Sequence, residues 1–162
     1  MPLPQRGGVR AYPRKMNPNP ALDPSHDPSR NKRNYLAAKA LFNARDIAGC
    51  VAHYSPEHKV HSAAGSPPAP PIRVFFEQTI ATWPDIEIRV EHAVAEEDWV
   101  MGRSVARATH AVPLMGIEPT HKIIETTFWD LHRFDAEGLI VETWNLMDGL
   151  SILRQLGALP SR

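Results

Sequence analysis

The chain has 162 residues, the length of one domain, with 43% hydrophobic and 22% charged residues, as in soluble globular proteins. Eighteen Lys and Arg residues balance eighteen Asp and Glu residues, which argues against a dedicated nucleic-acid-binding protein. The single Cys50 cannot form an intramolecular disulfide, and no segment reads as a membrane span or signal peptide. We therefore expect a cytoplasmic protein without nucleic-acid or membrane partners.

Residues 1–31 differ in composition from the rest of the chain. They contain seven of the sixteen prolines, and the first 39 residues carry eight basic side chains against two acidic ones. Such a segment buries too little apolar surface to offset its ordering entropy by itself. We therefore expect a basic, Pro-rich arm or disordered tail over residues 1–31 and one folded domain over residues 32–162.

In the first half of the domain, the apolar residues follow helical spacing. Lys39 falls on the same spacing as Tyr35 and Phe42. The pattern predicts helices over residues 31–43, 46–54 and 72–82. A brief strand at 59–61 and a Pro-rich loop at 63–71 are expected between the second and third helices. Ser29 or Asn31 is the expected N-cap of the first helix, and Asp46 that of the second.

The second half of the domain has the features of strands and turns. Ile86, Ile88 and Val90 alternate with charged residues, which predicts a half-buried strand. Further strands are expected at residues 99–111, 122–134 and 139–146, with turns at 96–98 and 135–138 and a short helix near 150–156. Helices followed by antiparallel strands are typical of the α+β class.

Five sequence motifs follow one another between about residues 35 and 160. They are ARDI through YSP at 44–56, WPDI at 83–86, TH at 109–110, MGIEPT at 115–120, and a segment at 133–160 with RFD, ETW, Asp148 and RQLGALP. In this order they resemble the motifs of the SnoaL-like polyketide cyclases, although His121 stands where that family usually has glycine. The resemblance implies the cone-shaped barrel of the nuclear-transport-factor-like superfamily. In that fold, a bent antiparallel sheet and about three helices enclose an apolar cavity, and the chains form homodimers or homotetramers.

Asp148 is the first candidate for acid/base catalysis. It follows Trp144 by four residues, and a carboxylate beside Trp144, Leu146 and Phe128 would be poorly solvated, which raises its pKa towards neutral pH. The family resemblance assigns the acid/base role to this aspartate. The alternative is an N-cap of the last helix, a position that Asp favours.

His132 is the second catalytic candidate. Pairing of Phe134 with Ile140 would place His132 and Asp130 on one face with Trp144, whereas a shift by one residue would separate them. In the first register, the imidazole orients Asp148 or donates to a substrate carbonyl. A structural or exposed strand histidine is the alternative.

Other side chains are expected to form the wall and the rim of a substrate site, although core packing or solvated loop positions are the alternatives. The substrate-binding candidates are Trp144, Asp130, Phe128, His61, Tyr54, His110 and Met101. Three histidines near Cys50, at positions 53, 58 and 61, lack the spacing of known metal motifs. We therefore expect no metal site.

These features favour a cofactor-independent cyclase that closes a ring in a polyketide-like substrate by an intramolecular aldol reaction. The chain has no glycine-rich phosphate loop, nucleophile elbow or Walker motif, so no cofactor is expected. The expected partner is a small hydrophobic substrate that contains carbonyl groups. Alternatives are a non-catalytic binding or interaction module of the same fold, and a hydrolase or isomerase such as an epoxide hydrolase. The hydrolase would need acidic residues that activate water and an arginine that points into the cavity, a role that Arg103 or Arg107 could fill.

Overall fold

A computed structural model describes residues 27–61 and 68–159. The elements are, in chain order, α1 (Pro28–Asn43), α2 (Ile47–Val51), β1 (Tyr54–His61), α3 (Ile72–Thr82), β2 (Glu87–Glu96), β3 (Trp99–Thr109), β4 (Ile123–Phe134), β5 (Ile140–Met147) and α4 (Gly149–Leu156). The predicted arm therefore lies mostly outside the described residues, and its last four positions, 28–31, belong to α1. Most of the predicted Pro-rich loop also lies outside them.

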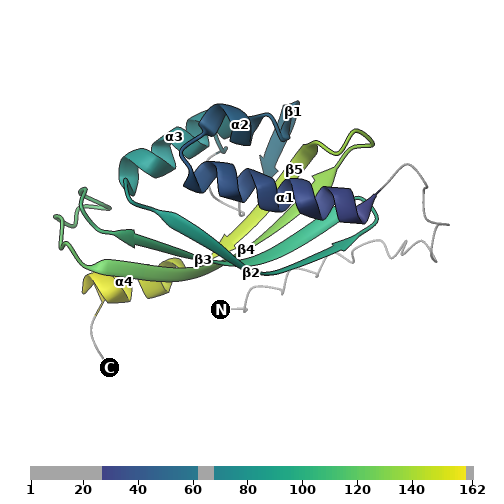
Figure 1. Cartoon of the computed structure of the whole chain (residues 1–162). Helices are drawn as coiled ribbons and strands as arrows, with labels where there is room; N and C mark the ends of the chain where they lie inside the picture. Colours follow the sequence, from purple (N-terminus) through teal and green to yellow (C-terminus); the bar gives the residue numbers. More distant parts are fainter. Residues whose placement is uncertain (1–26, 62–67, 160–162) are drawn as a thin grey trace, which may run out of the picture.

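The five strands form one sheet in the order β1-β5-β4-β3-β2. Neighbouring strands are antiparallel except β1 and β5, which are parallel. Helices α1, α2 and α3 lie over one face of this curved sheet, and α4 packs against β4 (Figure 1). The α+β class and the bent sheet under helices are confirmed. The sheet is mixed and stays open, because β1 and β2 form its two edges. Among the described residues, no helix combines the length and apolar character needed to cross a membrane.

The N-termini of the first two helices show how local chemistry sets their bounds. Asp27 caps α1 by accepting a hydrogen bond from the Arg30 backbone N–H (2.9 Å), and Pro28 fits the first helical turn. The predicted caps Ser29 and Asn31 were therefore wrong, because the helix starts earlier. Asp46 caps α2 as predicted and accepts from the Gly49 N–H (2.8 Å).

The core lies between α1 and the inner face of the sheet, the face that the three helices cover. Alternate residues of β3 and β4 point to this face and are buried, as the two-residue period of a strand requires. Phe128 and Phe134 of β4 pack in one cluster with Tyr35 and Phe42 of α1. The opposite, outer face carries exposed apolar side chains.

The register of β4 and β5 decides which residues share a face. Phe134 pairs with Ile140, as one of the two predicted registers required, but a bulge follows and shifts the remaining pairs by one residue. Trp144 therefore pairs with Leu131 on the outer face and not with Asp130. The predicted grouping of Trp144 with Asp130 and His132 is wrong, because a slip of one residue turns a side chain to the other face.

Candidate active site

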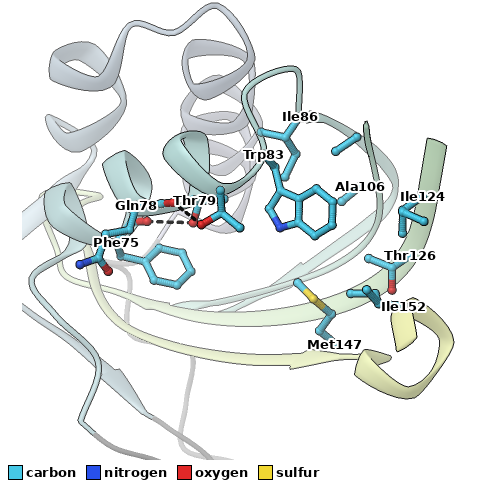
Figure 2. Close-up of a pocket in the computed structure, with 12 residues that line it drawn as sticks. Phe75, Gln78, Thr79, Trp83, Ile86, Ala106, Ile124, Thr126, Met147 and Ile152 are labelled. Atoms are coloured by element: carbon cyan, nitrogen blue, oxygen red, sulfur yellow. Dashed lines mark hydrogen bonds between the residues drawn. The ribbon is translucent and has the colours of Figure 1, made fainter. Parts of the chain in front are cut away.

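An apolar cavity of about 300 Å³ lies between α3 and the inner face of the sheet (Figure 2). Thr79 and Thr82 line it, but their hydroxyls donate to backbone carbonyls of their own helix (2.8 and 2.9 Å), which leaves the wall largely apolar. The other lining residues are Phe75, Gln78, Trp83, Ile86, Ala106, Ala108, Ile124, Thr126, Met147 and Ile152. The volume is at the lower end for small-molecule sites.

Asp148 lies where β5 ends and α4 begins, directly after the cavity-lining Met147. Its exposed carboxylate accepts a hydrogen bond from the Ser151 N–H (2.9 Å) and caps α4. Its backbone carbonyl accepts from the hydroxyl of Thr126 (3.3 Å), another lining residue. The side chain therefore has the capping role of the alternative interpretation, at the edge of the cavity.

A buried polar cluster occupies the inner face further along β4. Asp130, with 2% of its side chain exposed, forms an ion pair with Lys39 and accepts a hydrogen bond from the Tyr35 hydroxyl (2.9 Å). Gly102 makes this approach possible, because a Cβ there would lie 1.9 Å from the tyrosine oxygen. A buried ion pair of this kind requires close partners on both charges.

The electrostatics of the cluster fix two charge states. Burial would raise the pKa of the Asp130 carboxyl, but the Lys39 ammonium and His132 together hold it well below its usual range. Burial lowers the pKa of His132 more than neighbouring Asp130 raises it. At neutral pH the aspartate is therefore a carboxylate and the imidazole is neutral.

His132 faces protein groups on both sides of its ring. Its Nε2 lies 3.2 Å from Asp130 Oδ2, without the alignment of a hydrogen bond, and its Nδ1 lies 2.8 Å from Thr143 Oγ1. Asp148 contacts Thr126, which lies six residues before His132 on β4. At strand spacing, this separates Asp148 from His132 by about 20 Å. The predicted contact of His132 with Asp148 is therefore not made.

The remaining substrate-binding candidates are distributed over both faces of the sheet. Trp144, His61 and Met101 lie on the outer face, where the His61 and Trp144 rings stack with centroids 4.1 Å apart. They do not line the cavity. The bulge in β5 turns Trp144 outward, and His61 follows it through pairing with β5. Met101 pairs with the outward Leu131. Phe128 and Tyr54 are buried on the inner side, where they pack in the core.

His110 is the histidine that the structure places beside the cavity. It is 1% exposed, and its ring lies 6.0 Å from that of the lining residue Trp83. The backbone N–H of Thr120 donates to Nδ1 (3.1 Å), so in the neutral ring Nε2 carries the proton. Among the described residues, this Nε2–H has no hydrogen-bond partner.

Sequence analysis missed Lys39, Tyr35 and Thr143 as members of the polar cluster. The sequence contained one signal for this cluster: Lys39 falls on the helical spacing of the apolar residues of α1, which places a charged side chain on the buried face of the helix. The histidines considered for a metal are separated by the fold, since His58 contacts Thr143 on the inner side while His61 stacks outside. Within the described residues, no group of three or more His, Cys, Asp or Glu side chains is arranged to hold a metal ion.

The fold and the cavity define a class, the α+β proteins with an apolar cavity between helices and a curved sheet. The sequence profile of the SnoaL-like polyketide cyclases matches residues 32–156, so the chain belongs to this family. The resemblance stated from the motifs is thereby confirmed. A search of curated protein sequences found no significant match.

Solved structures of similar proteins share the fold. AclR from Streptomyces galilaeus, a proposed hydroxylase, is 28% identical with a TM-score of 0.74 over 83% of this chain and 100% of AclR. IdmH from Streptomyces antibioticus, a proposed polyketide cyclase, is 29% identical with a TM-score of 0.68 over 78% and 98% of the two chains. TsrD from Streptomyces laurentii is 22% identical with a TM-score of 0.70 over 82% and 98%. Because different activities are proposed for the first two, the reaction has to be argued from the site.

Proposed function

We propose that this protein closes a ring in a small polyketide-like substrate by acid/base catalysis without a cofactor. The observation that carries the proposal is the apolar cavity with Asp148 next to two of its lining residues, Met147 in sequence and Thr126 through a backbone hydrogen bond, in a chain of the SnoaL-like polyketide cyclase family. Such a cavity excludes water and holds a flexible chain in a folded shape, which favours an intramolecular reaction.

Asp148 is the proton carrier in this proposal. Its carboxylate removes a proton from a carbon between two carbonyl groups, and the resulting enolate carbon attacks a second carbonyl carbon of the same chain. A carbon–carbon bond forms, the attacked carbonyl becomes an alkoxide, and this oxygen takes the proton back from Asp148. A ligand that extends from the cavity past Met147 brings its acidic carbon within reach of this carboxylate.

His110 supplies the hydrogen bond that the forming negative charge needs. Its Nε2–H is buried beside the cavity wall and has no hydrogen-bond partner in the described part of the chain. An unpaired buried donor costs about 1–3 kcal/mol. A substrate carbonyl oxygen that accepts this hydrogen bond recovers part of that energy, and more of it as the oxygen gains charge. His132 acts within the cluster of Asp130 and does not touch the substrate.

The epoxide-hydrolase alternative receives no support from the arginines it named. Arg103 pairs with Glu91 and lies over the Trp129 ring on the outer face. Arg107 lies 3.7 Å from Glu125, also outside. Neither guanidinium points toward the cavity.

Ring closure by the full chain tests the proposal. A linear thioester with 1,3-dicarbonyl units is incubated with the wild type, with Asp148→Asn and with Thr79→Phe, and the cyclic product is quantified by mass spectrometry. Asparagine keeps the helix cap but is no base, and phenylalanine fills the cavity without a change of charge. We expect product with the wild type and at least a hundredfold less with either variant. Equal product with all three proteins would leave a non-catalytic binding module as the better interpretation.

We also propose that a second copy of the chain covers the outer face. Exposed and half-buried apolar side chains on β2 to β5 lie together there, and we call them the outer patch: Val94, Met101, Trp129, Leu131, Trp144 and Leu146. The neighbouring charges are paired within the chain, as in Arg133 with Glu142 (2.9 Å). An apolar patch bordered by paired charges is typical of an interface between copies.

A further inference from the structure

A second pocket, separate from the cavity described above, opens at the start of α3. It has a volume of about 500 Å³ and lies among α2, β1 and the start of α3. Its lining residues are Ala48, Val51, Ala52, Tyr54, Ser55, Pro56, His58, Pro71, Ile72 and Arg73. It shares no lining residue with the first cavity, so an inference about it does not rest on the proposed function.

His58 connects this pocket to the buried polar cluster. Its Nε2 lies 2.8 Å from Thr143 Oγ1, and the same hydroxyl lies 2.8 Å from Nδ1 of His132. The other nitrogen of His132 faces Asp130 at 3.2 Å. Three side chains from β1, β5 and β4 therefore form one hydrogen-bonded polar chain from the pocket to His132, and Asp130 faces the end of this chain without a hydrogen bond.

The charge of Asp130 fixes the position of every proton along this chain. A carboxylate only accepts, so the facing Nε2 of neutral His132 carries the ring proton and its Nδ1 carries a lone pair. The Thr143 hydroxyl then donates to that Nδ1, and its oxygen is left to accept from Nε2–H of His58. The remaining nitrogen, Nδ1 of His58, is therefore an acceptor.

This acceptor is shielded from solvent and has no hydrogen-bond partner among the described residues. An unmet buried acceptor is costly unless a ligand supplies the donor. We propose that His58 Nδ1 is the hydrogen-bond acceptor of a second ligand site, which takes an aromatic or enolic hydroxyl compound. Tyr54, whose ring meets His58 edge-on at 4.9 Å, and the apolar wall beside it hold the ring of such a compound.

The titratable neighbours of His58 keep it in the acceptor form. Burial, and then the neighbouring His132 and His61, lower the pKa of His58 to about 4. Tyr54 on the same strand stays a neutral phenol, because burial raises its pKa well above the usual value. Arg73 is the cation that lines the same pocket. At neutral pH the imidazole is uncharged, as an acceptor for a hydroxyl donor requires.

Long-range ¹H–¹⁵N NMR of the full-length chain tests the assignment before any ligand is added. We expect His58 and His132 both as neutral rings with the proton on Nε2. Addition of 1-naphthol is expected to shift the His58 Nδ1 resonance, whereas 1-methoxynaphthalene, which lacks the donor, is not. A proton on Nδ1 of His58, or equal responses to the two compounds, would overturn the proposal.

Two pairs of variants complete the test. Thr143→Val breaks the polar chain and is expected to weaken 1-naphthol binding about tenfold, while Thr143→Ser is expected to keep it. The cavity-filling Thr79→Phe should leave the His58 response intact, so failure here is distinct from failure of the proposed cyclase reaction. Loss of the response in Thr79→Phe would place the naphthol in the first cavity and overturn the second site.

Discussion

At the level of single residues, Gly102 is the position on which the buried cluster depends. It leaves room on β3 for the Tyr35 hydroxyl to reach Asp130, and any side chain there would collide with both. Asp130 in turn neutralises Lys39 and directs the protons of His132 and His58. A residue without a side chain thus leaves the room on which the arrangement of five polar side chains depends.

Gly102→Ala is expected to lower the free energy of unfolding by about 2–3 kcal/mol, because the new methyl group would lie 1.9 Å from a buried oxygen that cannot move freely. The matched control is Gly149→Ala, where an added Cβ meets no atom within 4 Å. Thermal unfolding of both variants measures the difference. A Gly102→Ala protein as stable as the Gly149→Ala control would contradict the described packing.

The buried histidine also predicts a pH dependence of stability. Since the pKa of His58 falls from 6.5 to about 4 on folding, the unfolded chain binds a proton between these values and the folded chain does not. Stability therefore falls as the pH drops from 6.5 to 4. His58→Gln should flatten this part of the melting-temperature profile, and a profile parallel to that of the wild type would count against the burial of this ring.

At the level of elements, α4 depends on the residue that we assign to proton transfer. Its cap, Asp148, accepts from Ser151 N–H, and its C-terminus ends at Gly157 in the left-handed region (φ 83°). The two roles of Asp148 are separable, because asparagine caps a helix about as well as aspartate while it lacks the basic carboxylate.

Asp148→Ala is expected to destabilise the protein by about 1 kcal/mol through loss of the cap, and Asp148→Asn by a few tenths at most. Denaturant unfolding of the two variants and the wild type gives the comparison. Equal losses in both variants would mean that the carboxylate charge, rather than the cap hydrogen bond, stabilises α4.

The elements also show where sequence reasoning succeeds. Residues 72–82 were predicted as a helix with the observed bounds, because Pro84 and the apolar spacing define it locally. The bulge between β4 and β5 has no such local signal, since it depends on how two strands meet. Because of this bulge, Trp144 and its neighbour His61 lie on the outer face and not in the expected site.

At the level of the whole molecule, the sequence motifs were sufficient to predict the family and the class of fold. They were not sufficient for the site, because the cluster of Lys39, Asp130 and His132 joins α1 to β4 over some ninety residues. Charge and burial of such groups follow from tertiary contacts, which spacing along the chain does not reveal.

The outer patch predicts the oligomeric state. Trp129→Glu introduces a charge at the centre of the patch and should convert a dimer into single chains, as measured by light scattering after gel filtration. Val74→Glu changes an equally exposed apolar residue on α3 and should leave the dimer unchanged. A wild type that elutes as a single chain at micromolar concentration would contradict self-association through this face.

The most direct test of the central claim is proton transfer itself. Deuterium incorporation at the carbon between the two carbonyl groups of ethyl benzoylacetate, a small aromatic compound of the proposed substrate class, is followed by NMR in D₂O with the wild type and with Asp148→Asn. We expect the wild type to accelerate exchange and the variant to lose about a hundredfold or more of this acceleration. Exchange that is no faster with the wild type than with Asp148→Asn would contradict a catalytic carboxylate at this cavity.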